Sequence, residues 1–303
     1  MRQTKPRFLS GRLLGVILAA LLVFSCTPAG SAMWKYLGTA SGFGDWGQEP
    51  PQLEIHLIDV GKADAILIKS QGQAALLDAG QAVSAGEVID YLYRHDVERL
   101  DYLIMSHPDR DHIGGMPQIL QELPVAELLQ PPLSPALQPE SQEFSDLLAG
   151  LEELSVPQTQ WWMGESIYLG GACLTAIGPV TQYDSTNNAS LVLRLTYGDF
   201  TALFCGDMEY EAEQGLILSG QNLKADWLKV GHHGSSTSSS LRFLWEVSPQ
   251  YAAISVGPDR NDLPREDVLS RLEEAGAKIY RTDVDGDILF AYDGKNLTVK
   301  TEK

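Results

Sequence analysis

The most informative stretch of this 303-residue chain reads SHPDRDHIGG and spans residues 106–115. It places two imidazoles and two carboxylates within six positions: His107, Asp109, Asp111 and His112. The preceding residues 100–105 (LDYLIM) are typical of a buried strand. His107 and Asp109 alternate along this strand-to-helix turn, so their side chains can face the same metal ion. The adjacent pair Asp111-His112 can face a second ion. The stretch therefore predicts a metal site; the alternative is a polar turn whose histidines bind nothing.

Two other strand-like segments also end in residues that bind metals. Phe204-Cys205-Gly206-Asp207 brings a carboxylate to the end of a strand predicted over 200–205. Lys229-Val230-Gly231-His232-His233-Gly234-Ser235 brings two histidines to the end of a strand predicted over 225–230. Each segment alone is typical of an ordinary turn. Together with residues 107–112 they are far more specific, because the ends of strands in a two-sheet sandwich can meet at one edge.

The pattern along the rest of the chain predicts clusters of strands with helices on the outside. Predicted strands cover 53–60, 64–70, 73–80, 166–177, 190–197, 251–256, 277–282 and 287–292. Predicted helices cover 84–95, 116–123, 143–154, a segment from 208, 240–246 and 265–276. Four prolines within 130–142 indicate a long loop. Two similar halves of this kind favour one domain with two facing sheets over an open parallel sheet.

The composition limits the partners of this chain. Its formal net charge is −18, and such acidity repels nucleic acid and anionic membranes unless a local site attracts phosphate. Three cysteines are present. Cys173 and Cys205 could form one disulfide outside the cytosol, but both lie in apolar, strand-like contexts where small buried cysteines are more typical.

The N-terminus has the features of a targeting segment. Four basic residues precede an apolar run, Leu13 to Phe24, that is too short for a comfortable membrane span of roughly 20 residues. Val23-Phe24-Ser25-Cys26 resembles a bacterial lipoprotein processing box with Cys26 as the lipidated residue. Secretion with cleavage after Ala32, or an uncleaved anchor, are the alternatives. We expect a signal segment at 1–26, a flexible tether at 27–52, a folded domain at 53–303, and an outward-facing, lipid-anchored protein.

Taken in order, these motifs resemble the metallo-β-lactamase superfamily, and within it the branch that contains the extracellular domain of ComEC-type competence proteins. The resemblance covers most of residues 53–292. It is carried by 57–61 (LIDVG) with Asp64-Ala65, 77–80 (LDAG), 106–115, 187–193 (NNASLVL), Gly206-Asp207 and 230–235 (VGHHGS). The resemblance implies an αββα four-layer sandwich, the metallo-β-lactamase fold.

The resemblance also implies a site with two divalent metal ions. One ion would take His107 and Asp109, the other Asp111 and His112, and Asp207 would bridge them. His232 would complete the second centre, although the sequence leaves His233 open. Asp78 would lie behind the ligands and orient a histidine N–H, with Asp64 structural in the same region. The residues that would act on the substrate are Asp111, His233, Asn188 and Ser235.

Two departures from the family pattern bear on the metal and the activity. Asp109 stands where most members have a second histidine, and the third block offers Asn188 in place of a histidine. More oxygen ligands favour a harder ion, which moves the expected metal from Zn²⁺ toward Mn²⁺. Leu263 stands where related sequences carry a histidine before the proline. A role of that histidine in substrate binding or proton transfer is therefore missing here.

The resemblance implies a metallo-hydrolase, and phosphodiester hydrolysis is the leading expectation, with DNA as a possible substrate. A phosphorylcholine esterase or a lactonase-type hydrolase of the same fold is the second hypothesis. The third is a catalytically weak surface module that binds a cell-wall polymer or a partner, and Leu263 favours it. No protein partner is evident from the sequence.

Overall fold

The computed structural model describes residues 51–258, 260 and 262–303. The segment predicted as a signal peptide, including Cys26, and nearly all of the predicted tether lie outside these residues. Within the described part of the chain, no helix is both long and apolar enough to cross a membrane.

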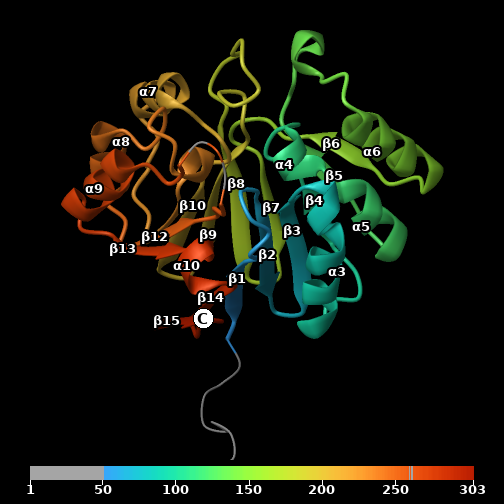
Figure 1. Cartoon of the computed structure of the whole chain (residues 1–303), viewed down its shortest axis with the longest axis horizontal. Coiled ribbons are helices and arrows are strands. Elements are labelled where there is room, and N and C mark those ends of the chain that lie inside the picture. The colour runs from blue at the N-terminus through green and yellow to red at the C-terminus, as the bar shows by residue number, and fades with distance from the viewer. Residues whose placement is uncertain (1–50, 259, 261) are drawn as a thin grey trace, which may run out of the picture. The chain divides into compact units, whose positions relative to one another are not determined.

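Two facing sheets form the centre of the described unit (Figure 1). The first sheet has the order β15 (Leu297–Thr301), β14 (Ile288–Tyr292), β1 (Leu53–Leu57), β2 (Ala65–Ser70), β3 (Gln73–Ala79), β4 (Tyr102–Ile104), β5 (Leu128–Gln130) and β6 (Gln158–Gln160). The second has the order β13 (Lys278–Arg281), β12 (Tyr251–Ile254), β11 (Trp227–Lys229), β10 (Phe200–Phe204), β9 (Val192–Tyr197), β8 (Ala172–Gly178) and β7 (Ser166–Leu169).

Helices cover the outer face of each sheet (Figure 1). The first sheet carries α3 (Ala85–Arg94), α5 (Met116–Glu122) and α6 (Gln142–Glu153), and the second carries α7 (Tyr210–Leu218), α8 (Leu241–Val247) and α9 (Glu266–Glu274). The short elements are α4 (Arg110–Ile113), α10 (Thr282–Asp285) and the 3₁₀ turns η1 (Ala82–Ser84), η2 (Pro135–Leu137) and η3 (Gly231–Gly234). The expected four-layer αββα sandwich is confirmed.

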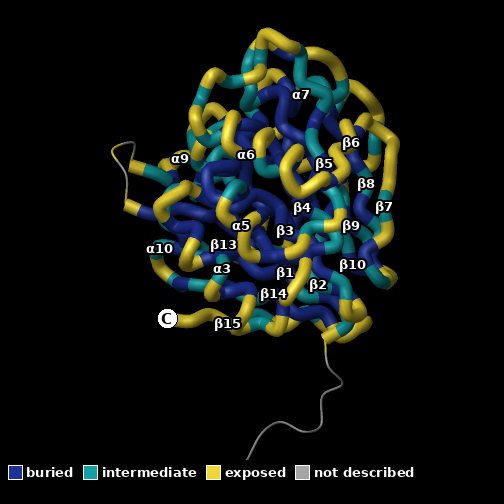
Figure 2. Tube along the Cα trace, turned by 90° about the vertical axis from the view of Figure 1, so that its right-hand side faces the viewer, coloured by how far each residue is buried: buried dark blue, intermediate teal, exposed yellow. Residues whose placement is uncertain are grey.

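Alternation along the strands explains these layers. Ile66 and Ile68 of β2 face the core between the sheets, whereas Leu67 faces the helices of the first outer layer. The same division holds in the second sheet, where Phe204 lies between the sheets and Leu203 packs under the outer helices. Figure 2 shows the result, with buried residues along the strands and exposed residues concentrated in the helices and loops.

Some details differ from the sequence-based expectation. The strand predicted over 166–177 is a hairpin of two strands, β7 and β8, because Gly170-Gly171 turns the chain between them. The three strands β5, β6 and β15 were not predicted; β5 and β6 have only three residues each, too few to show a period. Cys173 and Cys205 are both free thiols, and Cys205 is buried as expected of a small apolar side chain.

Parallel pairing brings the predicted metal ligands to one edge. β3 pairs with β4 in parallel, and β10 pairs with β11 in parallel, so the carboxyl ends of each pair point the same way. The chain leaves these ends into 106–115, Asp207 and η3. A backbone hydrogen bond from Leu191 N to Ser106 O (2.8 Å) joins the two halves at this edge.

Candidate metal centre

Asp207 lies at the centre of the cluster, and its two carboxylate oxygens face different histidines. Oδ1 is 3.3 Å from His112 Nε2 and 3.6 Å from His233 Nε2. Oδ2 is 3.8 Å from His107 Nε2 and 3.7 Å from His232 Nε2. One carboxylate therefore faces four imidazole nitrogens, two on each oxygen, which is the arrangement that a ligand shared between two ions needs.

Hydrogen bonds behind three of the histidines fix their tautomers. His112 Nδ1 is 2.8 Å from Asp78 Oδ2, and His233 Nδ1 is 2.9 Å from the carbonyl oxygen of Ser255. Both partners can only accept, so each Nδ1 carries the proton and donates it. Ser106 Oγ donates to Asp78 (2.6 Å) and so accepts from His107 Nδ1 (3.0 Å). In the neutral form of each ring, Nε2 then carries the lone pair and faces Asp207.

The polar atoms at the middle of the cluster have no hydrogen-bond partner among the described residues. They are Nε2 of His107, His112 and His233, and Oδ1 of Asp207. All three histidines are fully buried and Asp207 is 3% exposed. Burying such atoms without a partner is costly, whereas imidazole lone pairs and carboxylates are the ligands that Zn²⁺ and Mn²⁺ take. The residues present therefore fit the divalent ions that the sequence predicts.

Three sets of ligand atoms lie close enough to hold an ion, with the atoms of each set within 4.8 Å of one another. His107, His112 and Asp207 form one set, and Asp111, His112 and His233 form the second. In the third set, Asp64, Asp78 and His112, the two carboxylates already pair with Lys229 and with His112 Nδ1. Asp111 Oδ2 is 3.6 Å from His233 Nε2. The geometry thus places His233, which the sequence left as the alternative to His232, beside the Asp111-His112 pair.

His232 and Asp109 lie at the rim of the cluster on the His107 side. The Asp109 side chain is 42% exposed and its Oδ2 is 3.9 Å from His107 Nε2. His232 is 22% exposed, and its Nδ1 lies 3.3 Å from Glu209 Oε1. Both residues can reach an ion held by His107, so the expected pairing of His107 with Asp109 is compatible with the geometry and stays a prediction.

The backbone is forced into uncommon conformations to build this edge. His232 and His233 both have positive φ (49° and 52°), so the two rings leave the chain in different directions toward Asp207. Gly115 allows the motif to approach β3, because a Cβ there would lie 2.2 Å from the carbonyl oxygen of Ala79. Such strain persists only where the surroundings enforce it, and it is concentrated at functional sites.

Opposite charges control protonation in the cluster. Burial would lower the pKa of His112, but Asp207 and Asp78 together raise it well above its ordinary value. Burial would raise the pKa of Asp207, but His112 and His233 hold it well below its usual range. The carboxylate is therefore ionised and ready to coordinate, while His112 must lose a proton when a cation binds.

A buried ion pair supports the His233 turn from behind. Lys229 Nζ lies 2.9 Å from Asp64 Oδ2, and both side chains are 1% exposed. Asp64 Oδ1 faces His233 Nδ1 at 3.6 Å. The structural role expected for Asp64 thus has a concrete form, because its carboxylate connects Lys229 on β11 to the ring of His233.

Comparison with known families agrees with this geometry. The family model described as the metallo-beta-lactamase superfamily matches residues 58–257, which contain every residue of the cluster. The chain belongs to this superfamily.

Relatives of this superfamily member include competence proteins. It is 31% identical to ComE operon protein 3 of Bacillus subtilis, over 79% of this chain and 33% of that protein. It is 32% identical to competence protein ComA of Neisseria gonorrhoeae, over 90% of this chain and 38% of that protein. The chain thus spans about a third of the length of these relatives. The resemblance to ComEC-type proteins is confirmed as distant homology.

A solved structure with the same fold is CmlA, a diiron beta-hydroxylase from Streptomyces venezuelae. It aligns with a TM-score of 0.54 at 13% identity, and covers 85% of this chain and 59% of CmlA. At this identity the likeness concerns the fold alone.

In this metallo-β-lactamase domain, Asn188 and Ser235 have local roles. The Asn188 side-chain oxygen accepts from the backbone N–H of Glu209 (3.1 Å) and of Ala212 (3.4 Å), at the start of α7. Ser235 Oγ lies 3.0 Å from Thr237 Oγ1 within its own turn. Leu263 packs partly buried against the core under the second sheet's helices. Contacts with a substrate stay a prediction for Asn188 and Ser235.

Three residues of the domain's centre were missed by sequence reasoning. Ser106 relays the His107 ring to Asp78, Lys229 pairs with Asp64, and Lys62 Nζ lies 2.5 Å from Asp111 Oδ2. The sequence did contain an indication of the second pair. Lys229 lies inside the apolar strand that precedes His232, and a buried charge there needs a buried partner. Lys62 carried no such signal, since 49 residues separate it from Asp111.

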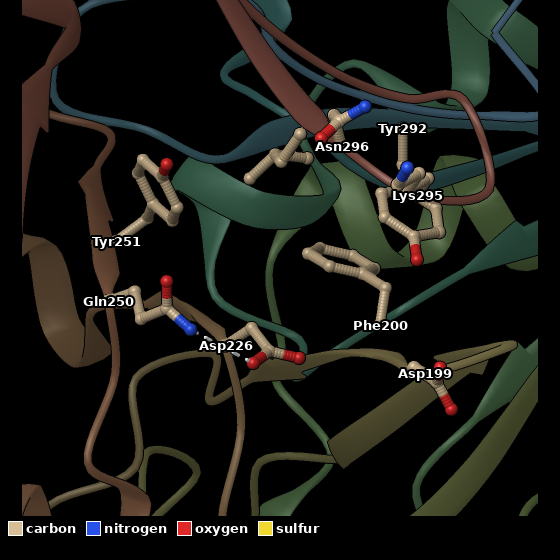
Figure 3. Close-up of a pocket in the computed structure, with 9 residues that line it drawn as sticks. Asp199, Phe200, Asp226, Gln250, Tyr251, Tyr292, Lys295 and Asn296 are labelled. Carbon is tan, nitrogen blue, oxygen red and sulfur yellow. Dashed lines mark hydrogen bonds between the residues drawn. The ribbon is translucent and has the colours of Figure 1, made fainter.

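A separate pocket of about 370 Å³ lies away from the metal centre (Figure 3). Its lining includes Asp199, Phe200, Asp226, Tyr251 and Lys295. Asp199 immediately precedes β10 and Asp207 follows it, so a strand of about 17 Å separates the pocket from the cluster. The pocket contributes nothing to the candidate metal centre.

Proposed function

We propose that this chain is a metal-dependent phosphodiesterase, with DNA as the leading substrate class. The observation that carries the proposal is the set of buried, unpartnered Nε2 atoms that surround Asp207. The relationship to competence proteins supports a nucleic-acid substrate, and the superfamily fold supports hydrolysis.

The two oxygens of Asp207 divide the proposed ligands into two groups. His112 and His233, on Oδ1, would hold one ion together with Asp111. His107 and His232, on Oδ2, would hold the other, with Asp109 at the rim. Two bound divalent ions supply an activated water and stabilise the leaving oxygen of a phosphodiester. Zn²⁺ and Mn²⁺ both suit this mixed set of nitrogen and oxygen ligands.

The protein's own residues set the geometry of this chemistry. Asp78 fixes the tautomers of two histidine rings, with the proton on Nδ1 of each. It contacts His112 directly and reaches His107 through the hydroxyl of Ser106. Ser255 does the same for His233. Asp111 faces the His233 side of the centre and is the residue that we expect to orient the attacking water.

The location of the protein is a further part of the proposal. Residues 1–26 favour export and lipid attachment at Cys26, which would place the domain on the outer face of the cytoplasmic membrane. Cys26→Ala is expected to move the protein from the membrane fraction to the soluble fraction, and unchanged fractionation would contradict the anchor.

Hydrolysis of a panel of substrates tests the activity. The purified domain loaded with Mn²⁺ or Zn²⁺ is expected to cleave bis-p-nitrophenyl phosphate and a labelled single-stranded oligonucleotide. A phosphorylcholine ester and a lactone serve as the competing substrates. Turnover of either of these with no cleavage of the phosphodiesters would replace the proposed function by the corresponding hydrolase.

A further inference from the structure

Lys62 places a cation at the partly exposed side of the metal centre, beside Asp111, which is called the opening below. It lies in the turn between β1 and β2, its side chain is 22% exposed, and its Nζ is 2.5 Å from Asp111 Oδ2. The same carboxylate oxygen faces His233 Nε2 at 3.6 Å. The ammonium thus contacts the carboxylate that forms a ligand set with His112 and His233.

The backbone around Lys62 is fixed to the motif. Asp64 N donates to the carbonyl oxygen of Asp111 (3.1 Å), which holds the turn against the start of α4. On its other side the turn packs on Gly257, where a Cβ would lie 2.5 Å from Gly61 Cα. These contacts hold the backbone of Lys62 close to Asp111, and its four-carbon side chain is the flexible part that can change position.

An ammonium and a divalent cation compete for Asp111. Both are attracted to the same carboxylate, and they repel each other when they bind it together. An ion held by Asp111, His112 and His233 therefore weakens the contact between Lys62 and Asp111. The displaced ammonium stays at the opening, because its backbone is held there.

Other cations near the centre are placed differently. Lys229 is 1% exposed and its ammonium pairs with Asp64, so it does not reach solvent. Arg110 is 71% exposed and points to Glu143 on α6, with its Nε 3.4 Å from Oε2. The whole chain carries a net charge of −18, which repels a phosphate group. A cation at the opening offsets this repulsion more effectively than the buried Lys229 or the outward-pointing Arg110, because it lies closest to where the phosphate would bind.

We propose that Lys62 exchanges between two anions. It binds Asp111 before a divalent ion occupies the Asp111 side of the centre, and it binds a non-bridging phosphoryl oxygen of the substrate afterwards. The first half concerns metal binding alone; the second half rests on the proposed phosphodiesterase function.

Lys62→Met tests the first half by metal titration. The variant removes the charge and keeps the length of the side chain, so the weaker of the two metal equivalents is expected to bind about fivefold tighter by calorimetry. Lys62→Arg keeps the charge and is expected to stay near the wild-type affinity. Lys295→Met, which removes the same charge in the distant β14–β15 turn (Figure 3), is the matched control. Equal metal affinities in Lys62→Met and the wild type would overturn this half.

Steady-state kinetics at saturating metal test the second half. Lys62→Met is expected to raise the KM for bis-p-nitrophenyl phosphate about tenfold with kcat little changed, because one charge-assisted hydrogen bond to the substrate is lost. Lys62→Arg is expected to recover most of the affinity. An unchanged KM would overturn the substrate role. If the wild type binds both ions but cleaves no phosphodiester, the proposed function fails, and the titration still decides the first half.

Discussion

Asp78 joins the first residue of the 106–115 motif, Ser106, to His112. Its carboxylate accepts from Ser106 N (2.8 Å), from Ser106 Oγ and from His112 Nδ1. Asp78 itself has a left-handed backbone (φ 58°), a conformation that aspartate tolerates better than most residues. One buried carboxylate therefore fixes the turn, two imidazole tautomers and the direction of two Nε2 lone pairs.

Asp78→Asn is expected to weaken metal binding about 10–100-fold, because the amide cannot accept as well from His112 Nδ1 and Ser106. Equilibrium dialysis against Mn²⁺ or Zn²⁺ measures the effect. Asp146→Asn makes the same chemical change on the exposed face of α6 and is expected to leave metal affinity unchanged. Equal affinity in the two variants would contradict the orienting role of Asp78.

At the scale of elements, α7 is connected to the site through Asn188. This side chain comes from the loop before β9, yet its oxygen caps the N-terminus of α7, which begins three residues after Asp207. The cap gives the carboxamide a structural role. A contact between Asn188 and the substrate stays a prediction, which the following variant tests.

Asn188→Ala is expected to lower the free energy of unfolding by about 1 kcal/mol through loss of this cap. Urea denaturation measures the change, and the catalytic rate with saturating metal is expected to stay within a few fold of the wild type. A loss of activity above about 100-fold with unchanged stability would instead assign Asn188 to the reaction.

α3 packs on the first sheet through a group of buried titratable side chains. His95, the C-cap residue of α3, stacks on Tyr91, with ring centroids 4.3 Å apart, and its ring lies 4.7 Å from the ring of His56. Burial first, and then the charges of His56 and Lys69, lower the pKa of His95 to about 4. The folded protein therefore favours the neutral form of the His95 ring.

This shift predicts a loss of stability in mild acid. The folded pKa of about 4 lies below the ordinary value of 6.5, so the unfolded chain binds more protons between these values. The contribution of His95 is fully present above pH 6.5 and is lost as the pH falls toward 4. Because the side chain is partly exposed, we expect a loss on the order of 1 kcal/mol. Thermal melts of His95→Gln should show a smaller decrease over this range, and an equal decrease would contradict the assignment.

At the scale of the whole molecule, the metal centre connects the two sheets. His107, Asp111 and His112 follow the first sheet, whereas Asp207, His232 and His233 follow the second. An ion bound by ligands of both groups would therefore crosslink the two halves of the fold.

Metal removal is expected to destabilise the entire domain. At an ion concentration of 100 Kd, binding stabilises the folded state by about 2.7 kcal/mol per site. For a domain of this size we expect EDTA, by removing both ions, to lower Tm by roughly 10–20 °C, with recovery when the ions are restored. Coincident melting by near- and far-ultraviolet circular dichroism would show that both halves respond together. A Tm that is insensitive to EDTA would contradict the crosslink.

The sequence predicted the parts of the fold that are encoded locally. Strand and helix periods, together with the ligands at three strand ends, were sufficient for the sandwich and for a metal site around His107, Asp111, His112 and Asp207. The positions of His232 and His233 relative to Asp207 could not be predicted, because they depend on two consecutive left-handed residues. The contact between Lys62 and Asp111 was equally invisible, since it joins a turn of the first hairpin to α4 only after the sheet has formed.

The central claim is that Asp207 lies between two divalent ions. Metal analysis of the purified domain after dialysis against Mn²⁺ or Zn²⁺ tests it most directly, in the wild type and in Asp207→Ala. The account predicts about two ions per wild-type chain and at most about one in the variant, with hydrolysis of bis-p-nitrophenyl phosphate reduced more than about 100-fold. A folded wild-type domain that retains no metal, or a variant that retains both ions and full activity, would contradict it.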